Sequence, residues 1–117
     1  MHELAVTDSI LSIVLNHAKR AGADQIVRIH VRISELSHLK AEWLQPYFDH
    51  LAEGSAAEGA LLVIESVPPG FTCGECGARF SISLARIEHV ECPHCGSRSC
   101  TLDSGDDYLV ESIEVAE

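Results

Sequence analysis

The chain reads FTCGECGARFSISLARIEHVECPHCGSRSC over residues 71–100, and this one segment holds all five cysteines of the 117-residue protein. Cys73 and Cys76 form a pair with two residues between them, and Cys92 and Cys95 form a second pair of the same spacing. Residues 77–91 separate the pairs, which matches the pattern of a zinc site in which two tight turns each aim two sulfurs at one ion. Residues suited to such turns flank the pairs: Gly74, Gly77, Gly96 and Pro93.

The alternative interpretation of the two pairs is a pair of disulfide bonds. The N-terminus, MHELAVTDSI, lacks the basic and apolar blocks of a secretory signal, so we expect a cytoplasmic protein with reduced thiols and favour zinc. Four thiolates fill a tetrahedral site, so the ion should be structural and should stabilise a module too small to bury much core. Cys100 can be a free or a packed thiol, and His89 or His94 can replace a thiolate or lie in solvent.

Two segments have the apolar spacing of amphipathic helices. The second, residues 42–53, contains Pro46, which removes a helical hydrogen bond, so we expect this helix to begin shortly before the proline or to kink there. The apolar stripe of the first, residues 4–21, comprises Val6, Ile10, Ile13, Val14 and Ala21 with His17 beside them, and that of the second comprises Trp43, Leu44, Tyr47, Phe48 and Leu51.

Three segments are predicted to be strands: residues 26–35, 60–67 and 108–115. The first alternates strictly from residue 27, as a half-buried strand does, and Pro68, Pro69 and Gly70 form a stiff linker after the second. In the first strand, one predicted face holds Val27, Ile29, Val31 and Ile33, and the other holds Arg28, His30, Arg32 and Ser34.

This order of elements predicts an α+β fold: a three-stranded sheet with two helices on one face, plus an inserted small zinc-ribbon-like module. The last strand has no apolar partner within the cysteine segment, so we expect it to return to the N-terminal sheet. We therefore assign residues 1–69 and 101–117 to the α+β domain and residues 70–100 to the zinc-binding module.

Charge and hydropathy exclude several classes of function. Eighteen acidic residues against eight basic ones give a formal net charge of −10, and the scattered basic residues argue against binding to nucleic acid or an anionic membrane. No apolar run approaches the ~18 residues of a membrane-spanning helix. A saturated zinc site and the lack of a readable nucleophile–base set predict a protein that is not an enzyme.

The first three residues, Met1-His2-Glu3, place an imidazole and a carboxylate beside a free α-amine. Ni(II) and Cu(II) in square-planar geometry favour nitrogen ligands of this kind, and His2 can close a chelate ring with main-chain nitrogens. A solvated terminal histidine is the alternative interpretation.

Several stretches together resemble the HypA/HybF family, the nickel-incorporation accessory proteins of [NiFe]-hydrogenase maturation. They are MHELAVTDSI, RIHVRISELS, LAEGSAAEGALLVIESVP, the C-x2-C…CPHC module and the terminal SIEV, in the same order along essentially the whole chain. The resemblance implies that His2 binds nickel with main-chain nitrogens of the first residues, and that Glu3 adjoins this site. It also implies that the four paired cysteines hold structural zinc.

The resemblance further implies that Ni(II) is cargo, delivered to the [NiFe]-hydrogenase large subunit together with the GTPase HypB. Some members also bring nickel to urease, which makes urease accessory proteins further candidate partners. The residues alone also permit a zinc-ribbon protein–protein adaptor that binds through its acidic surface and transfers no nickel.

Overall fold

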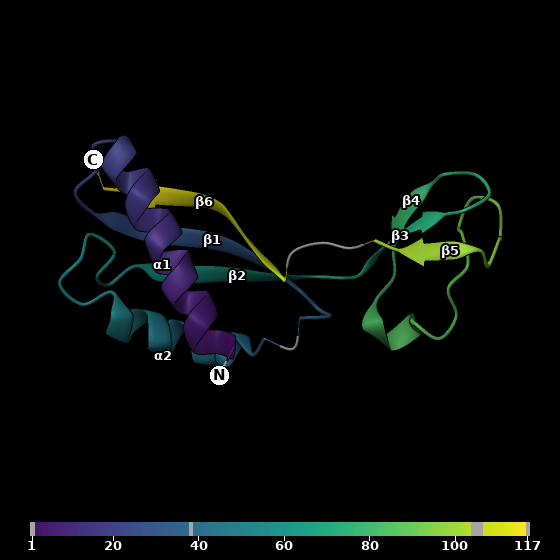
Figure 1. The fold of residues 1–117 in the computed structure, drawn as a ribbon, viewed down its shortest axis with the longest axis horizontal. Helices are drawn as coiled ribbons and strands as arrows, with labels where there is room; N and C mark the ends of the chain where they lie inside the picture. Colours follow the sequence, from purple (N-terminus) through teal and green to yellow (C-terminus); the bar gives the residue numbers. More distant parts are fainter. Residues whose placement is uncertain (1, 38, 104–106, 117) are drawn as a thin grey trace.

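The computed structural model describes residues 2–37, 39–103 and 107–116, and gives the backbone but not the side chain of His2. Figure 1 shows an elongated molecule, 53 × 28 × 17 Å, with two helices and one sheet at one end and a second sheet at the other. No described helix has both the length and the apolar character needed to cross a membrane. The elements are α1 (His2–Arg20), β1 (Ile26–Ser34), α2 (Ala41–Leu51), β2 (Leu61–Val67), β3 (Gly70–Cys73), β4 (Arg79–Ser81), the 3-10 helix η1 (Leu84–Arg86), β5 (Cys100–Leu102) and β6 (Tyr108–Val115).

The first sheet has the strand order β2-β1-β6. β2 runs parallel to β1, and α2 lies in the crossover connection that a parallel pair requires. β6 runs antiparallel to β1 on its other side. The chain therefore leaves this sheet after β2 and returns to it in β6, so the cysteine segment is an insertion between two strands. This confirms the predicted α+β architecture.

Both helices cover the same face of the first sheet, and the core lies between them and the strands (Figure 1). β1 is the central strand and contributes four buried side chains, so it is the most deeply embedded element of this sheet. The fully buried side chains with the largest volumes include Ile10 and Val14 of α1, Leu44 and Phe48 of α2, and Ile26, Ile29 and Val31 of β1.

The buried stripe of α1 differs in part from the prediction. Ile10 and Val14 are buried as expected, but Ala21 and His17 are exposed, because the helix turns Ala18 toward the core instead. Thr7, which the apolar pattern left out, is also fully buried. Its hydroxyl donates to carbonyl oxygens one turn earlier, so the polar atom is satisfied inside the helix.

The alternation predicted for β1 is wrong at its start. Val27 is 38% exposed, whereas Ile26 is 1% exposed and takes its place in the core. The pairing of β1 with β6 shifts register between Ile26 and Arg28, so one residue of β1 is left unpaired there. Such a β-bulge changes which residues face the core, and strict alternation holds only from Ile29 onward.

The second sheet has the order β4-β3-β5, with β3 antiparallel to both neighbours. Its apolar content is small: Phe71 is buried and its ring stacks on that of Phe80 at a centroid distance of 5.9 Å. The N–H of Leu84, at the start of η1, donates to Oε1 of Glu35 at 3.3 Å, which links this part to the end of β1. So little apolar burial leaves the fold of this segment dependent on its cysteines.

Candidate metal centres

The four paired cysteines converge on one point. Their Sγ atoms all lie within 4.8 Å of one another, with Cys73 3.6 Å from Cys95 and Cys76 3.5 Å from Cys92. A tetrahedral ion with Zn–S bonds of ~2.3 Å would place its sulfur ligands about 3.8 Å apart, so the sulfurs present fit a zinc-sized ion. Cys73 and Cys92 are buried and the other two are exposed, so the cluster lies at the surface of the small sheet.

Two similar turns position the sulfurs. The N–H of Gly77 donates to the carbonyl of Cys73 at 3.1 Å, and the N–H of Gly96 donates to that of Cys92 at 2.8 Å. Both glycines have φ of +75°, which other residues rarely adopt, so the tight turns depend on them. Gly74 lies in the first turn as the sequence suggested, and a Cβ there would lie 2.7 Å from the carbonyl oxygen of Ser99.

The electrostatics of the cluster favour a cation. Backbone N–H groups of Cys76 and Glu75 donate to Sγ of Cys73 and lower the pKa of its thiol to about 6. The N–H of Ser97 favours the thiolate of Cys95, but the neighbouring sulfur of Cys73 and burial outweigh it and raise the pKa of Cys95 to about 12. Four thiolates this close repel one another, and a bound divalent cation would relieve that repulsion.

The remaining candidates in the cysteine segment stay outside the cluster. Among the described residues, the sulfur group contains neither histidine, and both His89 and His94 are exposed. Cys100 is half-buried, and its Sγ lies 3.5 Å from the carbonyl oxygen of Ser97.

The start of α1 is the second candidate centre. Met1 and the side chain of His2 lie outside the described residues, so the description of this centre begins with the contacts of Glu3. Oε2 of Glu3 accepts a hydrogen bond from the backbone N–H of Lys40 at 3.1 Å, and the carbonyl of Glu3 accepts from the hydroxyl of Thr7 at 2.9 Å. The backbone N–H groups of Glu3 itself and of Lys40 lower the pKa of the Glu3 carboxyl. The anionic carboxylate therefore lies at the helix N-terminus, where the helix dipole favours it.

The loop before α2 is a part of this region that the sequence pattern missed. Its contact with Glu3 joins residues 37 positions apart, and no local spacing predicts it. The burial of Thr7 was only weakly indicated by the sequence, because Thr7 is a hydroxyl residue next to an apolar position of the helix stripe.

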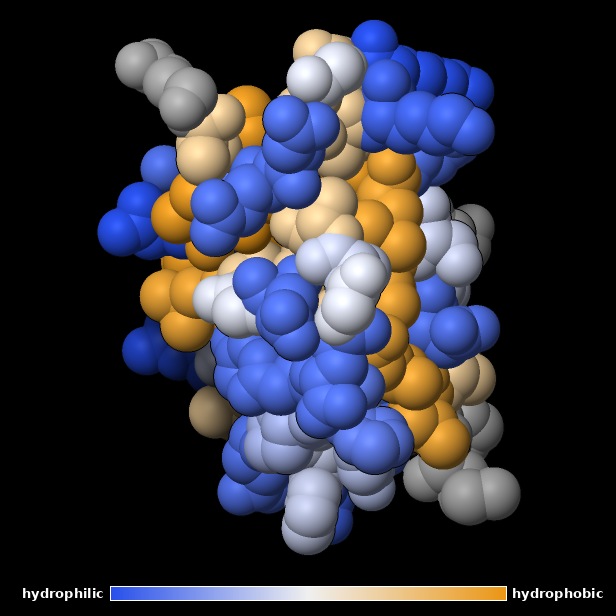
Figure 2. Space-filling model, turned by 90° about the vertical axis from the view of Figure 1, so that its left-hand side faces the viewer, coloured by the Kyte–Doolittle hydropathy of each residue, from blue (hydrophilic) through white to orange (hydrophobic). Residues whose placement is uncertain are grey.

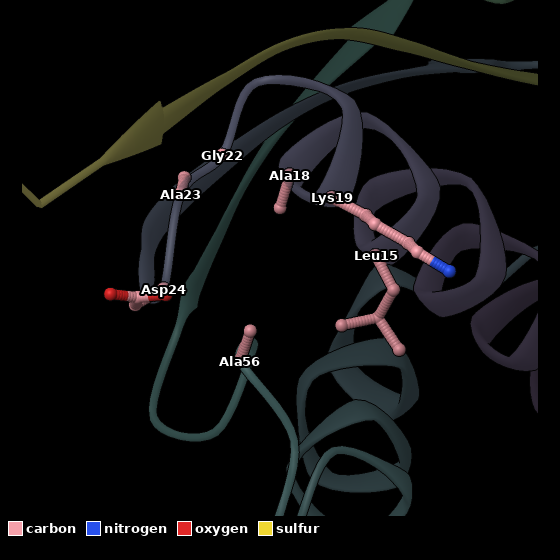
Figure 3. A pocket seen from close by; sticks show the side chains of 7 residues that line it. All are labelled: Leu15, Ala18, Lys19, Gly22, Ala23, Asp24 and Ala56. Atoms are coloured by element: carbon pink, nitrogen blue, oxygen red, sulfur yellow. The ribbon is translucent and has the colours of Figure 1, made fainter.

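The described surface also has hollows away from these two candidate centres. One of about 350 Å³ lies at the far end of α1 and is lined mainly by small apolar residues (Figure 3). Its two charged side chains, Lys19 and Asp24, point away from one another. Seen from this end, the molecule shows hydrophobic bands bordered by hydrophilic residues (Figure 2).

Fold and cysteine cluster together define a two-part metal-binding protein: a helix-covered sheet that carries a small four-thiol module. The chain matches the family described as hydrogenase/urease nickel incorporation, metallochaperone, hypA, over residues 1–115. It is 36% identical to hydrogenase maturation factor HypA of Methanopyrus kandleri, covering 98% of this chain and 93% of that protein. It is 35% identical to the HypA of Caldanaerobacter subterraneus subsp. tengcongensis, covering 98% and 99%.

Solved structures show the same fold. The solution structure of a HypA protein superposes with a TM-score of 0.73 at 26% identity, covering 99% of this chain and 97% of that one. The solution structure of the Ni metallochaperone HypA from Helicobacter pylori gives a TM-score of 0.69 at 24% identity, with 97% and 96% covered. The chain therefore belongs to the HypA family, whose members are metallochaperones of hydrogenase maturation and not enzymes. This confirms the resemblance noted in the sequence.

Proposed function

We propose that this protein binds Ni(II) at its N-terminus and delivers it to the [NiFe]-hydrogenase large subunit during maturation. The observation that carries the proposal is the family match from residue 1 to residue 115, which includes the Met-His-Glu start as well as the cysteine module. In this proposal residues 1–69 and 101–117 carry nickel, and residues 70–100 carry a structural ion. The two metals then occupy separate parts of the chain.

The nickel ligands are the imidazole of His2 and main-chain nitrogens of the first residues. The first N–H groups of an α-helix have no acceptor one turn earlier within the helix, and α1 begins at His2, so the first amide nitrogens of the chain are not used in helical hydrogen bonds. Nitrogen ligands of this kind suit Ni(II), and Glu3 adds a negative charge beside them. A site at the chain end opens easily, and protonation of His2 near its reference pKa of ~6.5 would favour release.

The structural ion is Zn(II), held by Cys73, Cys76, Cys92 and Cys95. Supporting this assignment are the sulfur separations of 3.5 and 3.6 Å and a soft all-thiolate donor set. Because four thiolates leave no open coordination position, zinc would stabilise the small sheet without taking part in transfer. Five unbridged cysteines also suit the reducing cytoplasm, where we place the protein.

The partners in this proposal are the GTPase HypB and the hydrogenase large subunit. The family description also includes urease nickel incorporation, so urease accessory proteins are further candidates. With a net charge of −10, the protein is expected to bind neither nucleic acid nor an anionic membrane.

Isothermal titration with Ni(II) tests the proposal. Wild-type protein with a native N-terminus should show one saturable site that His2→Ala abolishes. Two matched variants, His17→Ala on α1 and His30→Ala on β1, should bind nickel like the wild type. Equal nickel affinity in wild type and His2→Ala would remove His2 from the mechanism and favour a protein–protein adaptor without nickel transfer.

A further inference from the structure

Cys100 lies directly opposite a member of the metal cluster. β3 and β5 are antiparallel, and their register pairs Cys73 with Cys100. Cys100 is itself outside the group of four converging sulfurs, yet its side chain lies beside that of Cys73. The small sheet thus places a fifth thiol next to a cluster that four thiols already complete.

The hydrogen bonds of the ladder define the geometry of this pair. The N–H of Asp103 donates to the carbonyl of Gly70 at 2.8 Å, and the N–H of Gly74 donates to that of Ser99 at 2.6 Å. Residues 70 and 103, and residues 74 and 99, are therefore hydrogen-bonded pairs. Because such pairs alternate with non-hydrogen-bonded pairs along an antiparallel ladder, residues 73 and 100 form a pair of the second kind.

A non-hydrogen-bonded pair suits a disulfide bond. Its Cα atoms are about 4.5 Å apart, and both side chains project from the same face of the sheet. Disulfides span Cα separations of roughly 4.4–6.8 Å, so the backbone at this pair already lies in the range that a bridge needs.

We propose that Cys73 and Cys100 are a redox-sensitive pair, which hydrogen peroxide converts to a cross-strand disulfide with release of the ion from the cluster. The inference rests on the proposed zinc site, because Cys73 is one of its four ligands. A cysteine whose sulfur is in a disulfide can no longer bind zinc as a thiolate. The site then keeps only three of its four thiolate ligands.

The chemistry proceeds in two balanced steps. The Cys73 thiolate attacks one peroxide oxygen, the O–O bond breaks, and the products are the Cys73 sulfenic acid and hydroxide. The Cys100 sulfur then attacks the Cys73 sulfur, the S–O bond breaks, and the hydroxyl group leaves with the thiol proton as water. Two sulfurs are oxidised to one disulfide while one peroxide is reduced, and a dithiol such as dithiothreitol reverses the bridge.

Bridges within the cluster are the competing outcome. Cys95 lies 3.6 Å from Cys73 and Cys92 lies 3.5 Å from Cys76, and the exposed members of these pairs are open to oxidant. Each such bridge removes two zinc ligands and joins the two turns. The bridge to Cys100 removes only one ligand and joins two strands that are already paired.

Peroxide treatment of the whole protein tests the proposal, with Cys100→Ser as the matched variant. Zinc content is measured before treatment, zinc release is followed with a colorimetric chelator, and unreduced tryptic peptides are then mapped. Cleavage after Lys40, Arg79, Arg86 and Arg98 puts Cys73, Cys92 and Cys100 in different peptides, and fragmentation separates Cys73 from Cys76.

We expect the wild type to release zinc with peptides 41–79 and 99–117 joined through Cys73 and Cys100. Dithiothreitol should restore zinc binding, and Cys100→Ser should hold its zinc at the same peroxide dose. Bridges confined to the four cluster cysteines, or equally fast zinc loss in Cys100→Ser, would overturn the proposal. If the untreated wild type contains no zinc, the proposed zinc site is wrong. The peptide map would still show whether peroxide joins Cys73 to Cys100.

Discussion

Oε2 of Glu3 accepts a hydrogen bond of 3.1 Å from the backbone N–H of Lys40. The bond connects the first turn of α1 to the residue that precedes α2, so the two helices are tied together at the start of the chain. Glu3 is thereby held against the loop that precedes α2.

Substitution of Glu3 should separate its two contributions, hydrogen bonding and charge. Glu3→Gln keeps an oxygen that can accept from Lys40, so it should lower nickel affinity only mildly, through the lost charge. Glu3→Ala removes the acceptor, so the amide of Lys40 should exchange faster with solvent. Amide hydrogen exchange followed by NMR measures this, and equal protection of Lys40 in all three proteins would show that the bond contributes nothing in solution.

Loss of the cysteine cluster should unfold the small sheet and leave the helix-covered sheet folded. Cys92→Ala leaves three thiolates, so we expect loss of zinc and unfolding of residues 70–100, while α1 and α2 keep their helical circular dichroism. Cys100→Ala is the matched control and should retain one zinc per chain. Metal analysis with limited proteolysis measures both effects, and zinc retained in Cys92→Ala but lost in Cys100→Ala would reverse the ligand assignment.

The contacts of Glu114 on the outer face of the first sheet should make the stability of the protein depend on pH. Glu114 accepts from Nε2 of His30 at 2.6 Å and from Arg28 at 3.3 Å, and these partners lower the pKa of its carboxyl. A lowered pKa in the folded state means that its contribution is present above the usual value near 4.5 and is lost as pH falls through the lowered value. Glu114→Gln should therefore lower the urea midpoint at pH 7 and have less effect at pH 3.

Urea unfolding of wild type and Glu114→Gln at both pH values measures this difference. Glu88→Gln removes one charge from the cysteine segment, at the other end of the molecule, and controls for net charge. A gap between wild type and Glu114→Gln that stays the same at pH 3 would contradict a role for the ionised carboxylate.

Two neighbouring residues of β1 test the β-bulge. Ile29 is fully buried, so Ile29→Ala should destabilise the protein by about 2–5 kcal/mol. Val27 is 38% exposed, and Val27→Ala should change stability by less than about 1 kcal/mol. Chemical denaturation of both variants measures the difference. Equal losses would mean that Val27 faces the core after all, as strict alternation from residue 27 predicts.

The sequence predicted features that depend on local spacing and failed where distant segments meet. The two cysteine pairs and the helix–strand order follow from short-range patterns, so the four converging sulfurs and the return of β6 to the first sheet could be anticipated. The bulge at Val27 depends on pairing with β6, more than 80 positions away, and alternation within β1 carries no sign of it. The hydrogen bond between Lys40 and Glu3 also joins segments that are distant in the sequence, so no local pattern predicts it.

The most direct test of the central claim, that the chain start itself chelates nickel, is the Ni(II) dissociation constant of protein with a lengthened N-terminus. Residues fused before Met1 convert its amine to an amide and crowd the chelate, whereas the same residues fused after Glu117 leave the start unchanged. We predict that titration calorimetry will show sharply weakened nickel binding in the N-terminal fusion and native affinity in the C-terminal fusion, with zinc retained in both. Native affinity in the N-terminal fusion would contradict the claim and place the nickel ligands elsewhere in the chain.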